Sequence, residues 1–134
     1  MDDIVFNKIA IIEKCIGRIN EEYIGAESEF LSNYTKQDSV MLNIERAAQA
    51  SIDVSMHLVR VNKLGLPQNS REVFILLNER NIITEQTSVN MQKMVGFRNI
   101  AVHNYQQINL KIVANIVENK LDDFRVFIKE ILPN

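Results

Sequence analysis

The residues of this chain with the clearest chemical potential lie in one short stretch, residues 94–105, which has the sequence MVGFRNIAVHNY. Arg98 is a permanent cation whose planar donors fit a phosphate group. His103 can take or give a proton near neutral pH. An arginine and a histidine are the smallest set of side chains needed to cleave RNA without a metal ion, so this stretch predicts a ribonuclease site.

The predicted chemistry follows from the substrate. RNA carries its own nucleophile, the 2′-hydroxyl, which attacks the adjacent phosphate once a base removes its proton, and the unperturbed pKa of a histidine side chain, about 6.5, suits this task. We therefore expect His103 to act as the base or the acid. Negative charge grows on the nonbridging phosphate oxygens in the transition state, and a fixed guanidinium aimed at them lowers the barrier. Arg98 is the candidate for this role.

The spacing of the two residues poses a geometric problem. A five-residue step on an ideal helix separates two side chains by roughly 140°, whereas Asn99 and His103 are one turn apart and share a face. Either the helix ends or bends between Arg98 and His103, or a twofold partner supplies half of the cleft. Asn99 can cap a helix end, or it can orient His103 and the substrate by hydrogen bonding, and the second role is the one we predict.

The stretch resembles the signature of the HEPN superfamily, specifically of its HepT-type toxins. In that family an arginine, a polar residue, a few further residues and a histidine form the catalytic motif, and a tyrosine lies two positions beyond the histidine. Arg98, Asn99, His103 and Tyr105 occupy those positions. Residues 37–57 are similar to the family's long second helix, and residues 108–131 to its closing helix. The chain has a glutamine, at position 49, where the family pattern has a second acidic residue.

The resemblance implies partners and a means of control. HEPN nucleases are typically dimers whose motifs face each other across the interface, so a homodimer is expected here. Tyr105 is similar to the HepT tyrosine to which a partner antitoxin, a minimal nucleotidyltransferase, adds AMP. Such a modification would fill the RNA-binding cleft and neutralise the Arg98 cation. Alternatively, Tyr105 stacks on a base or bonds to a phosphate in the cleft, or packs at the edge of the core.

A second polar feature precedes the motif. Glu45, Gln49, Asp53 and His57 recur at every fourth position, so on a helix their side chains form one line. The simpler interpretation is a solvated face with an ordinary pair between Asp53 and His57. The sharper hypothesis is that Glu45, Asp53 and His57 wall the catalytic cleft or a symmetric interface.

Composition limits the other possibilities. The 134 residues suit one domain, 1–134. The net charge of −2 argues against binding of nucleic acid over a broad positive surface. Any positive potential that binds RNA must therefore be local or be assembled by oligomerisation. The single Cys15 cannot form an internal disulfide, and no cysteine and histidine spacing suits zinc, so we expect neither a metal nor a cofactor. No apolar run approaches the roughly 20 residues that span a bilayer, and the N-terminus carries acid where a secretory signal carries base. These features predict a cytoplasmic protein with no membrane contact.

The first half of the chain is patterned for helices. Apolar residues at helical spacing predict a helix over residues 2–22, followed by a short helix or loop around Phe30. Thr35, three residues before Asp38, resembles a capping box and predicts the start of a long helix that runs to about Lys63.

The second half continues in the same way. Ser70 is expected to cap a third, short helix, Thr84 a fourth that leads into the motif, and Asn109 a last helix whose apolar stripe runs unbroken from Leu110 to Ile128. No segment alternates with a period of two, as a strand would. The sequence therefore predicts an all-α, up-and-down bundle of about five helices, similar to the HEPN fold.

Taken together, these features predict a homodimeric, metal-independent ribonuclease that acts as the toxin of a bacterial toxin–antitoxin pair. The alternative is a non-catalytic helical module that binds nucleotide or nucleic acid, or serves as an adaptor for a nucleotidyltransferase. A purely structural helical dimer is a third possibility, in which His103 is an ordinary surface histidine and Arg98 an ion-pairing residue.

Overall fold

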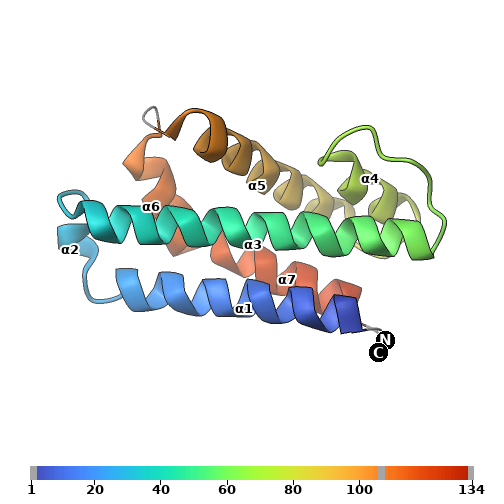
Figure 1. The fold of residues 1–134 in the computed structure, drawn as a ribbon, viewed down its shortest axis with the longest axis horizontal. Helices are drawn as coiled ribbons and strands as arrows, with labels where there is room; N and C mark the ends of the chain where they lie inside the picture. The colour runs from blue at the N-terminus through green and yellow to red at the C-terminus, as the bar shows by residue number, and fades with distance from the viewer. Residues whose placement is uncertain (1–2, 106–107, 133–134) are drawn as a thin grey trace.

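In the computed structural model, which describes residues 3–105 and 108–132, all regular structure is helical (Figure 1). This confirms the all-α prediction, although the described residues form seven helices rather than about five. Their bounds are α1 Asp3–Tyr23, α2 Glu27–Phe30, α3 Tyr34–Val61, α4 Glu72–Glu79, α5 Glu85–His103, α6 Leu110–Asn119 and α7 Leu121–Ile131.

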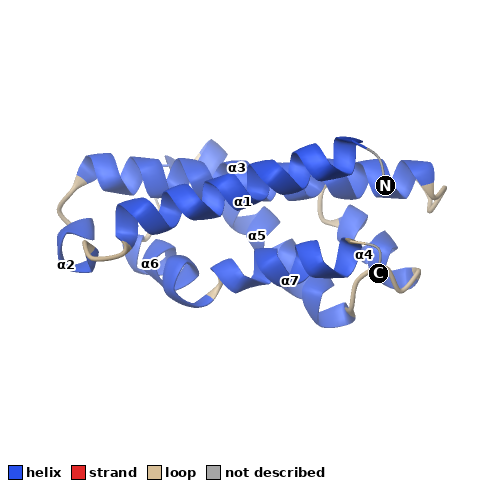
Figure 2. Cartoon of the chain, turned by 90° about the horizontal axis from the view of Figure 1, so that it is seen from below, coloured by secondary structure: helices blue, strands red, loops and turns tan. Residues whose placement is uncertain are grey.

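The two longest helices, α1 and α3, lie side by side and run in opposite directions, with α6 and α7 below them in the view of Figure 2. Residues of α3 at helical spacing are fully buried, among them Val40, Ile44 and Ala47. Small residues such as Ala47 and Ser51 let neighbouring helices approach closely. The apolar stripe visible in the sequence is thus the core-facing side of α3.

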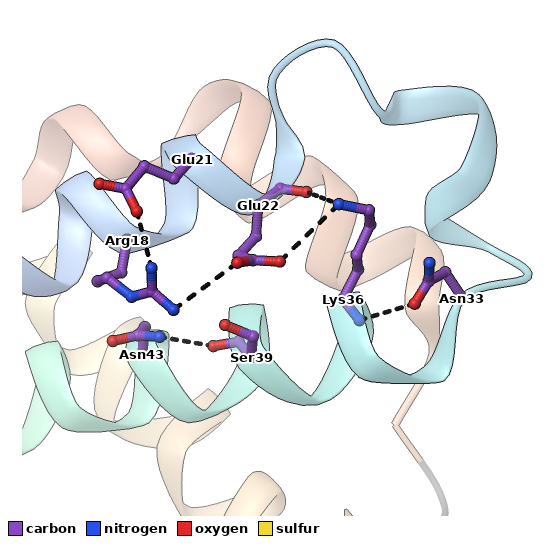
Figure 3. Close-up of polar contacts among 7 residues, drawn as sticks. All are labelled: Arg18, Glu21, Glu22, Asn33, Lys36, Ser39 and Asn43. Atoms are coloured by element: carbon purple, nitrogen blue, oxygen red, sulfur yellow. Dashed lines mark hydrogen bonds and ion pairs between the residues drawn. The ribbon is translucent and has the colours of Figure 1, made fainter.

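The start of α3 is fixed by Asn33 and not by the predicted Thr35 cap. Asn33 has an extended backbone, and its side-chain oxygen accepts a hydrogen bond from the Lys36 N–H at 3.0 Å. The Lys36 ammonium in turn lies 3.9 Å from the Glu22 carboxylate at the end of α1 (Figure 3). Asn33 satisfies a free N–H of the first helical turn, so Thr35 is left inside the helix. These contacts hold the first turns of α3 against α1.

The predicted closing helix is divided in two, which corrects the expectation of one unbroken helix. Lys120 leaves helical geometry at φ −122° and ψ −7°, and its N–H still closes α6 by bonding to the Ile116 carbonyl at 2.8 Å. Asp122 and Asp123 then occupy the first turn of α7, where acidic side chains favour a helix start. The bend allows Phe127 to pack edge-on against Phe74 of α4, with ring centres 5.7 Å apart.

The other predicted helix starts are partly confirmed. Thr84 accepts from the Thr87 N–H at 3.2 Å, and Asn109 accepts from the Lys111 N–H at 2.8 Å, as expected for caps. Ser70, by contrast, does not cap α4. The N-cap position is Arg71, which makes no side-chain cap bond, and the Asn69 side-chain oxygen accepts from the Arg71 and Glu72 N–H groups at 3.1 and 3.0 Å in the turn before the helix.

No helix within the described residues is long and apolar enough to cross a bilayer.

Candidate active site

Helix α5 positions the residues of the predicted motif. Its buried side, which includes Met91, Met94, Val95 and Ala101, anchors the helix in the core. The helix is continuous from Glu85 to His103, so it does not end between Arg98 and His103. This excludes a helix end, one of the geometric solutions offered by the sequence. A five-residue step on a helix separates the two side chains by roughly 140°.

Arg98 lies half-buried in the last turns of α5. Its Nη1 donates a hydrogen bond to the Asn99 side-chain oxygen at 3.1 Å. Its Nε is buried and bonds to no acceptor within the described part of the chain. A buried donor without an acceptor costs about 1 to 3 kcal/mol, so this N–H favours the arrival of an anionic or carbonyl oxygen. In this structure Asn99 bonds to Arg98, whereas the sequence suggested that it orients His103.

His103 is the final residue of α5, and its side chain is exposed. The backbone turns immediately afterwards, where the Asn104 N–H bonds to the Ile100 carbonyl at 2.7 Å. The imidazole is thus presented at a helix end, open to a substrate or to a second protein molecule.

Tyr105 follows in the turn after α5 and is 47% exposed. Its hydroxyl donates a hydrogen bond to the carboxylate of Asp38, in the second turn of α3. Partial burial, the hydrogen bond and the Asp38 charge raise the pKa of Tyr105 to about 12. Sequence reasoning missed Asp38 as a site residue, because its spacing from Thr35 suggested a helix cap.

The polar line on α3 is divided among three surroundings. Glu45 lines a hollow of about 340 Å³ together with Tyr105, Asp38 and Ala101. Asp53 instead forms an ion pair with Lys8 of α1 at 3.2 Å and accepts from the Gln49 amide at 2.8 Å.

His57 is buried, and its Nδ1 lies 3.1 Å from the Arg60 guanidinium. The structure therefore brings Glu45 beside Tyr105, whereas Asp53 pairs with Lys8 of α1 and His57 lies beside Arg60 near the end of α3.

A basic groove adjoins the motif on another side of α5. It has a volume of about 430 Å³ and an apolar floor that includes Phe97 and Ile112. Arg71, Lys93 and Lys120 line it, with Asp123 as the acidic residue among its lining side chains. Burial raises the pKa of Asp123. Three cations around one carboxylate give this groove a local positive charge that the net charge of the chain conceals.

Neither a reactive cysteine nor a set of metal ligands is found at the site among the described residues. Cys15 is buried, and burial raises the pKa of its thiol, so it is a poor nucleophile. Within the described residues, no three histidine, cysteine, aspartate or glutamate side chains lie together as a set of metal ligands.

The helical fold and the arginine, histidine and tyrosine at the end of α5 define a protein of the HEPN class. Residues 12–131 match the model of the family described as "Ribonuclease HepT-like". The chain therefore belongs to the HepT-like family.

Similar proteins carry names from the same family. The chain is 50% identical to the "mRNA nuclease HepT" of Shewanella oneidensis over 131 residues, which cover 98% of each chain. It is 25% identical to the "tRNA nuclease HepT" of Aphanizomenon flos-aquae over 103 residues, covering 77% of this chain and 70% of that relative. A solved structure described as a tri-AMPylated Shewanella oneidensis HEPN toxin in complex with MNT antitoxin superposes with a TM-score of 0.93 at 50% identity and covers 98% of both chains.

Proposed function

We propose that this protein is a metal-independent RNA endonuclease, formed by one domain of residues 1–134, that acts in the bacterial cytoplasm as the toxin of a toxin–antitoxin pair. The observation that carries the proposal is the end of α5, where the buried Arg98 Nε has no acceptor among the described residues and the His103 side chain is exposed. The name of the 50% identical Shewanella relative, an mRNA nuclease, supports the same activity.

The two residues divide the chemistry of RNA cleavage. His103 takes the 2′-hydroxyl proton or returns a proton to the leaving oxygen. Arg98 binds the nonbridging phosphate oxygens, where negative charge accumulates, and an acceptor there satisfies its buried Nε. Asn99, bonded to an Nη of Arg98 at 3.1 Å, holds the guanidinium in place.

The active cleft is proposed to form between two copies of the chain. Because α5 continues unbroken through the motif, the side chains of Arg98 and His103 of one copy point in different directions, and a twofold partner brings a second pair to face them. Exposed apolar side chains on the last turns of α5, Ile100 at 51% and Val102 at 42%, suit burial in such an interface.

RNA also needs contacts away from the reacting phosphate. The basic groove of Arg71, Lys93 and Lys120 supplies cations for neighbouring phosphates. The net charge of −2 argues against a broad positive surface for nucleic acid, but this groove supplies positive charge locally. Glu45, Asp53 and His57 remain candidates for a cleft wall, with Glu45 supported by its place beside Tyr105.

Control of the toxin is proposed to occur at Tyr105. A minimal nucleotidyltransferase antitoxin would add AMP to its exposed hydroxyl, as the tri-AMPylated state of the similar Shewanella toxin suggests. The added phosphate and nucleotide then occupy the end of α5 and repel RNA.

The test is cleavage of total cellular RNA by the purified protein in EDTA. We expect cleavage by the wild type and a loss of about 10²- to 10⁴-fold in rate for His103→Ala, with a comparable loss for Arg98→Ala. Arg125→Ala, which removes an exposed arginine of α7, is the matched control and should keep full activity. A wild type that cleaves no RNA at any pH would overturn the nuclease and favour the nucleic-acid-binding adaptor.

A mixing experiment tests the shared cleft. If each cleft takes Arg98 from one copy and His103 from the other, an equal mixture of the two inactive variants should recover about a quarter of wild-type activity through mixed dimers. No recovery after subunit exchange would place both residues of each cleft in one copy.

A further inference from the structure

We propose that Asp38 is the base that accepts the Tyr105 phenol proton when an adenylyl group is transferred to the Tyr105 oxygen. The proposal rests on the proposed control of the toxin at Tyr105 and adds a catalytic residue for that reaction. It means that the modified protein, and not only the transferase, supplies part of the chemistry.

The three tyrosines of the chain show why Tyr105 would be selected. Tyr34 is the most exposed, at 79%, but within the described residues its hydroxyl has no hydrogen bond to a carboxylate. Tyr23 does bond to a carboxylate, that of Glu118 at 2.9 Å, but it is only 5% exposed. Tyr105 is 47% exposed and also has a carboxylate partner. A transferase that required only an exposed tyrosine would modify Tyr34. One that required an exposed tyrosine with a proton acceptor beside its hydroxyl would modify Tyr105.

The phenol needs such an acceptor. With a pKa of about 12, Tyr105 is ionised in only about one molecule in 10⁵ at pH 7. Neutral phenol is a weak nucleophile, and a base within hydrogen-bond reach overcomes this by removing the proton as the new bond forms. Protein kinases use an aspartate in the same way to accept the proton of a substrate hydroxyl. Asp38 already accepts the hydrogen bond from the reacting oxygen.

The position of Asp38 is well supported by its helix. It lies one turn after the α3 start, which Asn33 caps and which Lys36 ties to Glu22 of α1. Figure 3 shows these supporting contacts on the first turns of α3. The carboxylate is therefore held on a rigid element, and Tyr105 comes to it from the turn after α5.

The reaction balances with a nucleoside triphosphate as the donor. The Tyr105 oxygen attacks the α-phosphorus of ATP, and the bond between that phosphorus and the oxygen bridging to the β-phosphate breaks. Pyrophosphate leaves with the electron pair. The phenol proton passes to an Asp38 carboxylate oxygen and from there to solvent, which Asp38 can reach because it is exposed.

The experiment measures AMP incorporation by intact mass, with the protein incubated with a purified MNT-type nucleotidyltransferase, ATP and Mg²⁺. The key variant is Asp38→Asn, which keeps the shape and an acceptor oxygen but cannot take a proton. We expect its rate of modification to fall by about 10²- to 10³-fold at pH 7. Asp38→Glu should retain more activity than Asp38→Asn. Glu118→Gln is the matched control, because Glu118 is the carboxylate partner of the buried Tyr23 and is not among the residues that line this hollow, and its rate should not change.

The pH dependence separates proton transfer from docking. Asp38 and Glu45 are the titratable side chains that line this hollow beside Tyr105 within the described residues. Burial is the largest cause of the raised Tyr105 pKa and remains in Asp38→Asn, whereas losing the Asp38 charge lowers that pKa. The phenolate fraction also grows about tenfold per pH unit, so phenolate becomes increasingly available without a base as the pH approaches 10. The ratio of wild-type to Asp38→Asn rates should therefore shrink to less than about tenfold at pH 10. A ratio that stays constant from pH 7 to pH 10 indicates lost docking and overturns the proposal.

Two other results of the modification assay would lead to different conclusions. Equal modification of wild type and Asp38→Asn at pH 7 overturns the role of Asp38 and leaves control at Tyr105 intact. No modification of wild-type Tyr105 overturns both. Circular dichroism and thermal unfolding of Asp38→Asn should match those of the wild type, which shows that slower modification is not caused by unfolding.

Discussion

Two tyrosine–carboxylate pairs lie in different regions of this molecule and share the same chemistry. Tyr23, at the end of α1, bonds to Glu118 of α6 at 2.9 Å, and Tyr105, after α5, bonds to Asp38 of α3. Burial and the neighbouring carboxylate raise the pKa of each phenol to about 12. The pairs differ in access: Tyr23 is 5% exposed, whereas Tyr105 is 47% exposed.

The difference shows that a polar pair does not by itself define a site. Tyr23 is buried and also packs edge-on against Phe30, with ring centres 5.2 Å apart, so its bond to the exposed Glu118 ties α1 to α6 at the edge of the core. Tyr105 makes its bond at the surface, in a hollow that another molecule can enter. We infer that the first pair serves stability and the second serves chemistry.

The largest expected difference between the two pairs is in the addition of AMP to their tyrosines. Tyr105→Phe should abolish AMP incorporation, because it removes the accepting oxygen, while Tyr23→Phe should leave incorporation unchanged. Intact mass and peptide mapping after incubation with the nucleotidyltransferase and ATP measure both. Undiminished incorporation into Tyr105→Phe would place the acceptor elsewhere, with exposed Tyr34 as the next residue to map.

The free energy of unfolding should fall at alkaline pH because of both tyrosine–carboxylate pairs. Because the folded state holds each phenol proton more tightly than the unfolded chain, it binds more protons than the unfolded chain between about pH 10 and pH 12. Their contribution to stability is therefore fully present below pH 10 and is lost as the pH rises to about 12. Urea unfolding across this range should show a smaller loss in Tyr23→Phe than in the wild type. Identical pH profiles would mean that the Tyr23 pKa is not raised by folding.

At neutral pH a smaller stability difference should remain between the same two variants. Tyr23→Phe removes one hydrogen bond to a carboxylate and should lower the free energy of unfolding by about 1 kcal/mol, or roughly 4 °C in Tm. Tyr105→Phe should change it by less than about 0.5 kcal/mol, because its pair is exposed to solvent. Calorimetry measures both, and a larger loss in Tyr105→Phe would reverse the assignment of roles.

The smallest effect concerns the middle of α5, next to the basic groove. A Cβ at Gly96 would lie 2.7 Å from Nη2 of Arg71, so Gly96→Ala should displace the end of that side chain. Alanine favours the helix by up to about 1 kcal/mol over glycine, so the Tm should stay level or rise slightly. RNA affinity should fall by less than about tenfold, with a weaker salt dependence if Arg71 binds a phosphate. Unchanged affinity and salt dependence would remove Arg71 from the RNA contacts.

Much of the architecture could be predicted from local pattern. The apolar stripe of α3, the Thr84 and Asn109 caps and the helix that carries the motif all depend on residues close in the chain, and all are confirmed. The break at Lys120 could not be predicted, because the apolar spacing continues across it. The helix that follows this break places Phe127 against Phe74, and a contact between residues so far apart in the chain is not visible in local spacing.

The sequence by itself determined the all-helical class and the presence of an arginine, an asparagine, a histidine and a tyrosine within eight positions of one segment, because helical periodicity and residue type are local properties. The tertiary structure alone decided that Asp38 meets Tyr105, 67 positions away, and that Glu45 shares their hollow while Asp53 pairs with α1. It also decided which of two similar tyrosine pairs is buried. These outcomes depend on how α1, α3 and α5 pack against one another, and contacts between residues so far apart in the chain leave no local pattern in the sequence.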